Sequence, residues 1–143
     1  MSARPQGAMA GGGGVMATIF AVDGDKATLS VYREALVMMN HSVVGEAADS
    51  HEALRIYRKM ERFPDFVLMD YRTTHANDIE AMHEMRRINP EQCLILVTSD
   101  RKAACEIKSM GANTFVLKPF RLAALSAIIN NALVSRQRKE KTA

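Results

Sequence analysis

The chain has 143 residues, no tryptophan, only two cysteines and no long hydrophobic run. Two cysteines, Cys93 and Cys105, are too few for a disulfide framework or a cysteine-ligated metal site, so both are predicted to be reduced, mostly buried thiols of a cytoplasmic protein. No apolar stretch approaches the roughly 20 residues that a membrane span needs. The first residues also lack the apolar segment of a secretory signal. We therefore expect a protein that neither spans a membrane nor depends on disulfide bonds.

Aromatic residues are also scarce, at 6% of the chain. The formal charge of +3 is concentrated in residues 136–143, where four basic side chains stand against one acid. A nucleic-acid-binding surface needs a basic stripe interleaved with aromatics, and the rest of the chain has none, so direct binding of nucleic acid is not expected. Residues 136–143 are interpreted as a basic C-terminal tail, a solvated helix end that the helix dipole favours.

The composition that is present is typical of one globular domain, with 48% hydrophobic and 24% charged residues. Residues 1–15 include four consecutive glycines and are interpreted as a flexible linker or a cloning remnant. Residues 16–135 then form a single domain, which is long enough for one hydrophobic core.

Strand-like and helical patterns alternate five times after the glycines. Strands are predicted at 17–22, 43–47, 66–70, 93–98 and 114–117, and helices at 28–39, 50–60, 78–88, 101–110 and from 119 onward. Short connections between such units imply right-handed crossovers and a parallel sheet. Five units are too few to close a barrel of eight, so the sequence predicts an α/β fold with a three-layer open sheet.

Helical spacing also predicts which side chains form the core. The last helix is expected to face inward through Leu122, Leu125, Ile129 and Leu133. Met38, Met39, Met82 and Met85 are interpreted as core residues rather than as a cofactor site. His75 and His83 have no partner acids or cysteines at ligand spacing, so they are interpreted as loop and helix-surface residues.

Polar side chains stand at the ends of four predicted strands. Asp70 ends the apolar run 66–70. Asp23 and Asp25 follow the first predicted strand, Thr98 ends the fourth, and Lys118 follows the fifth. A parallel sheet brings the carboxyl ends of its strands to one edge, where open α/β folds bind ligands. We therefore expect these groups to share one site. Taken singly, each has a structural alternative: a helix cap, a strand-end hydroxyl or a surface turn.

The chemistry of such a site is phosphoryl transfer. A carboxylate such as Asp70 is a nucleophile toward phosphorus and forms an acyl phosphate. Mg²⁺, which prefers carboxylates and waters, neutralises the charge between the two partners, and Asp23 or Asp25 would share it with Asp70. Lys118 and the Thr98 hydroxyl are suited to contact phosphoryl oxygens.

The chain resembles the receiver domain of two-component response regulators. The resemblance rests on these strand ends, on Thr98-Ser99 and on the closing segment 111–120. The resemblance covers residues 16–135. It implies a flavodoxin-like sheet of strand order 2-1-3-4-5. It implies a Mg²⁺-dependent phosphoacceptor, Asp70, which takes its phosphoryl group from a sensor histidine kinase or a phosphotransfer protein. Thr98 and Lys118 would contact that group, and Thr98 and Phe115 would change position with signalling state.

The chain departs from the family pattern after the first strand. Receivers usually carry two adjacent acids there, and the second position is Gly24 in this chain. Side chains alternate along extended chain, and glycine permits a sharp turn, so we hypothesise that Asp25 partly replaces the missing acid, with weakened metal affinity.

The loop that follows Asp70 also departs from the pattern, because residues 72–78 lack the usual proline and glycine. The backbone carbonyl of Arg72 matches the family's third metal ligand. The Arg72 side chain and Asp100 match the two positions that help set the lifetime of the phosphoryl group. A salt bridge between them across the site is a further hypothesis.

Three functions fit these residues. The first is a stand-alone response regulator that catalyses only its own phosphorylation and slow dephosphorylation, and is otherwise not an enzyme. The alternative is a pseudo-receiver, a protein-binding module with weak or no phosphorylation, which Gly24 and the altered loop favour. An aspartate-nucleophile phosphatase is disfavoured, because Arg72 stands where its general acid would be and no insertion supplies a cap. Asp70, Thr98 and Lys118 favour the first.

Too few residues follow the domain for an effector, so output is expected to run through the receiver surface. The expected surface combines the last two helices and the last strand, with Ile107, Met110, Phe115 and Ile128. We expect an unknown downstream protein to bind there, and a monomer or a weak homodimer.

Overall fold

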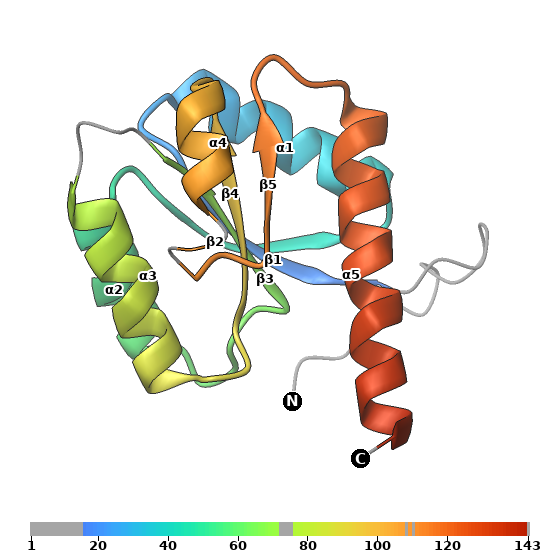
Figure 1. The fold of residues 1–143 in the computed structure, drawn as a ribbon. Coiled ribbons are helices and arrows are strands. Elements are labelled where there is room, and N and C mark those ends of the chain that lie inside the picture. The colour runs from blue at the N-terminus through green and yellow to red at the C-terminus, as the bar shows by residue number, and fades with distance from the viewer. Residues whose placement is uncertain (1–15, 72–75, 108, 110, 143) are drawn as a thin grey trace.

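The structure, a computed structural model, describes residues 16–71, 76–107, 109 and 111–142. Strands and helices alternate along this part of the chain (Figure 1). The strands are β1 (Thr18–Val22), β2 (Ser42–Ala47), β3 (Phe66–Asp70), β4 (Cys93–Thr98) and β5 (Thr114–Leu117). The helices are α1 (Lys26–Met38), α2 (Ser50–Arg58), α3 (Ala76–Ile88), α4 (Arg101–Ile107) and α5 (Leu122–Thr142).

The strands form one parallel sheet in the order β2-β1-β3-β4-β5, which confirms the expected topology. The register aligns the carboxyl ends of the strands. Val22 lies opposite Met69, Asp70 opposite Val97, and Thr98 opposite Leu117. The residues that follow or end β1, β3, β4 and β5 therefore meet at one edge.

Helices cover both faces of the sheet, which makes the three predicted layers (Figure 1). Helices α1 and α5 bury one cluster, which includes Leu36, Ile95 and Ile129. Helices α2, α3 and α4 cover the other face, whose cluster includes Tyr57 and Met85. Central strands buried on both faces are why the sequence shows continuous apolar runs instead of alternation.

The expected start of the last helix at residue 119 is wrong. Its hydrogen bonding begins at the carbonyl of Arg121, which accepts from the amides of Ala124 and Leu125, so the helix starts at Leu122. Leu122 is exposed rather than buried, and the inward stripe begins at Leu125. Ile129 and Leu133 continue that stripe as predicted. Helix α5 then runs to Thr142, so most of the expected basic tail is helical.

Two of the core methionines are confirmed and one is wrong. Met82 and Met85 are buried, but Met38 is 84% exposed. Met38 follows the buried Leu36 by two residues, which places it on the other side of helix α1. Met39 is partly buried against the same cluster as Leu36.

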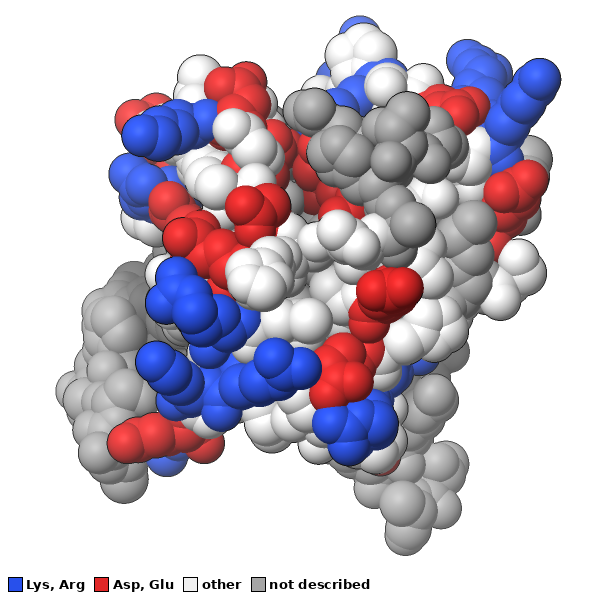
Figure 2. All heavy atoms as spheres, turned by 90° about the vertical axis from the view of Figure 1, so that its left-hand side faces the viewer, with Lys and Arg blue, Asp and Glu red and all other residues white. Residues whose placement is uncertain are grey.

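The face formed by α2 and α3 carries charges of both signs side by side (Figure 2). Arg58 from α2 pairs with Glu84 from α3 at 3.4 Å, and Arg87 pairs with the same carboxylate. Arg55 pairs with Glu52 along α2. Such a mixed surface is typical of a solvated face, and His83 is exposed as predicted. Within the described residues, no helix is long and apolar enough to cross a membrane.

Candidate functional site

Three of the predicted groups lie in contact at the carboxyl edge of the sheet. The ammonium of Lys118 lies 3.0 Å from Asp70 Oδ1 and 3.3 Å from Asp23 Oδ2. The side chains of Asp23 and Asp70 are only 1% and 10% exposed, and that of Lys118 is 30% exposed. Two carboxylates and one ammonium leave this little-hydrated cluster with one net negative charge, which favours binding of a cation.

Lys118 stays charged in this setting. Partial burial by itself lowers the pKa of Lys118, but the hydrogen bond and charge of Asp70, followed by those of Asp23, outweigh it and raise the pKa overall. The backbone amide of Lys118 donates to the carbonyl of Thr98 at 2.8 Å, which fixes the start of the side chain. A cis peptide bond joins Lys118 to Pro119.

Asp23 is held rigidly by the chain around it. Its amide donates to the carbonyl of Ala47 at 3.0 Å, and its Oδ1 accepts from the amide of Asp25 at 2.9 Å. Its Oδ2 therefore points to Lys118, on the side of Asp70. Asp70 is positioned by strand β3, and the next amide, of the buried Tyr71, donates to the carbonyl of Val97 at 2.7 Å.

Asp25 has the structural role that was the alternative interpretation for an acid after a strand. It is the N-cap of α1: Oδ1 accepts from the amide of Ala27 at 3.1 Å and Oδ2 from the hydroxyl of Thr28 at 2.8 Å. The bond from Thr28, followed by that from Ala27, lowers the pKa of Asp25. Among the described side chains, no three from His, Cys, Asp or Glu are placed to hold a metal ion. The expected set of Asp23, Asp25 and Asp70 is therefore not assembled.

Gly24 has room for the Cβ of the acid that receivers usually carry at this position. Among the described residues, a Cβ built on Gly24 meets only the carbonyl oxygen of Ala48, at 3.4 Å, which is an ordinary contact distance. A side chain at this position is therefore not excluded by a clash at its first carbon.

Thr98 links the site to the start of α4. It is buried, and its hydroxyl accepts from the amide of Asp100 at 3.2 Å, while Asp100 accepts from the amide of Lys102 at 2.9 Å. Phe115 lies opposite Leu96 in the sheet, and Thr98 follows Leu96 by two residues on β4. Because side chains two residues apart on a strand point to the same face, Phe115 and Thr98 share a face of the sheet. Phe115 is half-buried against the cluster under α2, α3 and α4. This placement suits the predicted packing switch, which stays a prediction.

The remaining predicted groups lie outside the described parts of the chain. They are Arg72 with its carbonyl, His75, Met110, and the side chains of Cys105 and Ile107. The Arg72–Asp100 salt bridge is therefore also outside. Ile128 is half-buried on α5.

Tyr32 packs against the segment that follows Lys118, and the sequence patterns did not single it out as a functional residue. It lies on the inward face of α1, and its ring stacks on that of Phe120, two residues after Lys118. Burial raises the pKa of the Tyr32 phenol, and the nearby charges of Asp23 and Asp70 add to this effect. The sequence signal that could have identified it is a tyrosine among the otherwise aliphatic inward-facing side chains of α1.

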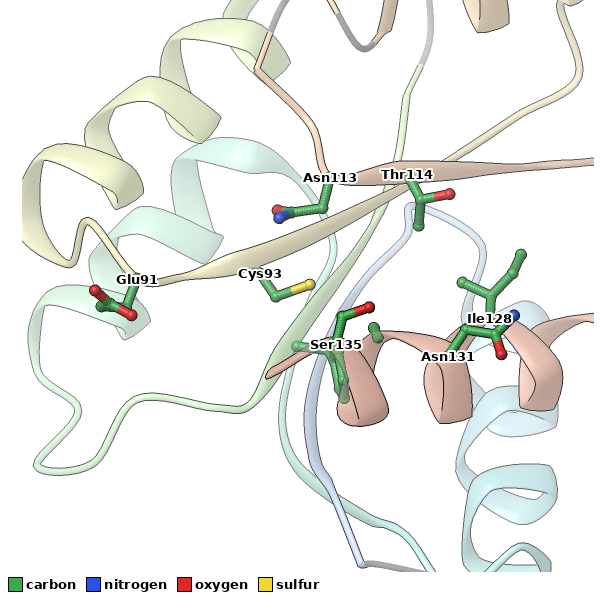
Figure 3. A pocket seen from close by; sticks show the side chains of 9 residues that line it. Glu91, Cys93, Asn113, Thr114, Ile128, Asn131 and Ser135 are labelled. Carbon is green, nitrogen blue, oxygen red and sulfur yellow. The ribbon is translucent and has the colours of Figure 1, made fainter. Parts of the chain in front are cut away.

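A cavity of about 360 Å³ lies at the opposite end of the strands (Figure 3). It separates the start of β4 and β5 from α5, and Cys93, Asn113, Thr114 and Asn131 line it. Cys93 opens β4 whereas Asp70 closes the neighbouring β3, so the strands lie between this hollow and the charged cluster. The cavity is not part of the candidate site.

The sequence matches the family model of the response regulator receiver domain over residues 19–130. It is 33% identical over 107 residues to Protein CcdB of Bacillus subtilis (strain 168), covering 73% of this chain and 88% of that protein. It is 28% identical over 100 residues to the chemotaxis protein CheY of Thermotoga maritima, and the match covers 68% of this chain and 82% of that protein. A two-component response regulator of the LuxR family from Aurantimonas sp. SI85-9A1 has a similar structure, with a TM-score of 0.75, 29% identity, and coverage of 85% and 87%.

Proposed function

Because this chain belongs to the response regulator receiver domain family, we propose that it accepts a phosphoryl group on Asp70 from a phosphohistidine of a sensor kinase or a phosphotransfer protein. The observation that carries this proposal is the position of Lys118, whose ammonium touches both Asp70 and Asp23. That arrangement places a fixed positive charge next to the attacking carboxylate, where negative charge gathers during phosphoryl transfer.

In the proposed reaction an oxygen of Asp70 attacks phosphorus as the bond from phosphorus to the histidine nitrogen breaks. The electron pair of that bond leaves with the imidazole, and the product is an acyl phosphate on Asp70. Lys118 transfers its contact from Asp70 to a phosphoryl oxygen, and the Thr98 hydroxyl donates to a second one. Asp23 orients the ammonium through the contact at 3.3 Å until Lys118 moves to the phosphoryl oxygen and gives up this contact.

The residues fit a Mg²⁺ ion with a reduced ligand set. Mg²⁺ is commonly held by one or two carboxylates, with waters and phosphate completing its octahedron. Asp23, Asp70 and the carbonyl of Arg72 would hold it, and the net negative charge of the cluster supports this. Asp25 would join them only by giving up its cap on α1. The ion would neutralise charge between the carboxylate and the phosphoryl oxygens.

Signalling follows from how the site connects to the surface. Thr98 is bonded to Asp100 at the start of α4, so a hydroxyl drawn toward the phosphoryl group pulls on this connection. Phe115 would repack on the same face, and the downstream protein would bind over α4, β5 and α5. Arg72 and Asp100 would modulate the phosphoryl lifetime. The protein would act in the cytoplasm as a signalling module whose only chemistry is on itself.

The test is phosphorylation by a small donor. We expect incubation with acetyl phosphate and Mg²⁺ to add one phosphate to the intact mass, and Asp70→Asn to abolish the increment. Asp49→Asn is the matched control, because it makes the same chemical change at the cap of α2, where asparagine caps equally well. An unmodified wild-type protein, or an increment that persists in Asp70→Asn, would contradict the proposal. The first result would favour the protein-binding module.

A further inference from the structure

The hydroxyl of Tyr32 is buried without a hydrogen-bond partner. Tyr32 is 3% exposed, and among the side chains that the structure describes its oxygen alone is both buried and unpaired. Buried polar groups in native proteins are nearly always paired, because leaving one unpaired costs much of its hydration free energy. This hydroxyl therefore requires a partner that the described residues do not supply by direct contact.

Tyr57 on the opposite face shows how the same group is normally satisfied. Its hydroxyl donates to Gln92 Oε1 at 2.7 Å, and Gln92 donates in turn to the carbonyls of Pro64 and Cys93. Its ring stacks on Phe63 with the centroids 4.8 Å apart. Both tyrosines are buried and stacked, so the comparison isolates the hydroxyl.

The surroundings of Tyr32 point to the charged cluster. Its ring is stacked on Phe120, with centroids 6.2 Å apart and an interplanar angle of 14°. Phe120 is the last residue of the segment 118–120, which begins with Lys118. The stacked ring places Tyr32 beside the segment whose Lys118 contacts both carboxylates. In agreement with this placement, the charges of Asp23 and Asp70 add to the effect of burial in raising the pKa of the phenol.

We propose that Tyr32 is a positioning residue for Lys118: its hydroxyl donates through one buried water to the Asp23 carboxylate, and its ring holds residues 118–120 in place. Asp23 is the favoured acceptor because it is almost fully buried and its lysine contact, at 3.3 Å, is the longer of the two. A water with a phenol and carboxylates around it has the polar partners that a buried water requires.

The consequence for the reaction rests on the proposed function. When Lys118 moves to a phosphoryl oxygen, the buried Asp23 carboxylate loses its ammonium partner. The donor from Tyr32 compensates for part of that loss, which lowers the cost of the lysine movement. The hydroxyl therefore accelerates phosphorylation without touching the phosphoryl group.

The kinetic test compares Tyr32→Phe with Tyr57→Phe, which make the same change on opposite faces. We expect Tyr32→Phe to slow phosphorylation of Asp70 by acetyl phosphate roughly three- to tenfold, the size of one net hydrogen bond. We expect Tyr57→Phe to leave the rate within about twofold. An unchanged rate in Tyr32→Phe, or equal slowing in both variants, would overturn the proposal.

A second measurement needs no phosphoryl donor. This measurement is a double-mutant cycle followed by urea unfolding. The combined effect of Tyr32→Phe and Lys118→Met on the unfolding equilibrium constant should differ from the product of the two single effects by roughly threefold or more. The effect of combining Tyr57→Phe with Lys118→Met should equal the product of the single effects. Stabilisation by Tyr32→Phe with no coupling would mean an unpaired hydroxyl and would overturn the proposal. Coupling in a protein that cannot be phosphorylated would support the contact and refute the proposed function instead.

Discussion

The two ends of the parallel sheet are built in opposite ways. At the carboxyl end, one ammonium lies within 3.3 Å of an oxygen of each of two carboxylates. At the amino end, a cavity of about 360 Å³ separates the sheet from α5, and uncharged polar groups and apolar side chains make up most of its lining. The comparison shows that the cavity and the charged groups suited to chemistry lie at different ends of the same sheet. The candidate site is identified by charges held at converging strand ends, where open α/β folds place their ligands.

Removing the ammonium should have the largest effect. Lys118→Met leaves the two carboxylates facing each other and takes a donor from the phosphoryl oxygens. We expect the rate of phosphorylation by acetyl phosphate to fall at least roughly a hundredfold, the scale of losing one donor to a developing charge. Lys59→Met, at the exposed end of α2, is the control. A rate within threefold of wild type, measured by intact mass, would show that Lys118 is not part of the reaction.

Restoring the second acid should sharpen the chemistry of the same end. Because the backbone at Gly24 accepts a Cβ without a clash, Gly24→Asp should fold normally and tighten Mg²⁺ binding by about tenfold, or about 1.4 kcal/mol. Gly24→Asn supplies the same shape without the charge. Tyr71, next to Asp70, is a suitable fluorescence reporter for the titration in a chain without tryptophan. An unchanged titration would refute this account of the weakened metal site.

The ion pair should also appear in the stability of the protein. Lys118 has a raised pKa in the folded state, so its contribution is fully present below the unfolded value of 10.5 and is lost as the pH rises above the folded value. We expect Lys118→Met to lower the free energy of unfolding by about 1–2 kcal/mol at neutral pH, since the pair is only partly hydrated. Urea unfolding should show that this difference persists from neutral pH up to the unfolded pKa of Lys118 and shrinks as the pH rises above the folded pKa. A difference that does not shrink at strongly alkaline pH would show that the charge of Lys118 is not its cause.

The capping role of Asp25 predicts a smaller effect. Asp25→Asn keeps the cap and should leave the Mg²⁺ affinity within about threefold, whereas Asp25→Ala should lower the melting temperature by a few degrees. A tenfold loss of Mg²⁺ affinity in Asp25→Asn would support the hypothesis that Asp25 is a metal ligand. Calorimetric titration and thermal unfolding separate the two roles.

The smallest effect is expected at the amino end. Ala132 lines the cavity, so Ala132→Leu adds apolar volume where space exists. We expect phosphorylation to remain within about twofold of wild type, because the change is separated from Asp70 by the length of the strands. A larger change would show that the two ends of the sheet are coupled.

The sequence predicts the sheet well, because buried parallel strands read as short apolar runs and short connections restrict their order. It also predicts that Asp70 and Lys118 meet, since both stand at strand ends. The side chain of Asp25 was harder to place. Alternation along extended chain would put it beside Asp23. However, α1 begins at Lys26, and the amide of Ala27 and the hydroxyl of Thr28 in its first turn donate to the carboxylate instead.

Other differences also arise from local hydrogen bonding and packing that no periodicity encodes. The start of α5 is set by the Arg121 carbonyl rather than by Pro119. Met38 has the residue type of the core but lies on the outer side of α1. Tyr32 fits the inward stripe as an apolar residue. Only the structure shows that its hydroxyl is buried without a partner among the described residues and that its ring stacks on Phe120.

The length of α5 has a mechanical consequence. Its 21 residues span about 31 Å, at about 1.5 Å per residue, so it is much longer than the strand of four residues that precedes it. Leu133 is its last buried side chain among those described. A rod anchored near its first three turns acts as a lever, since a tilt of about 10° at Leu122 would displace its far end by about 5 Å on that geometry. A small tilt at the start of α5 would thus be magnified at Thr142.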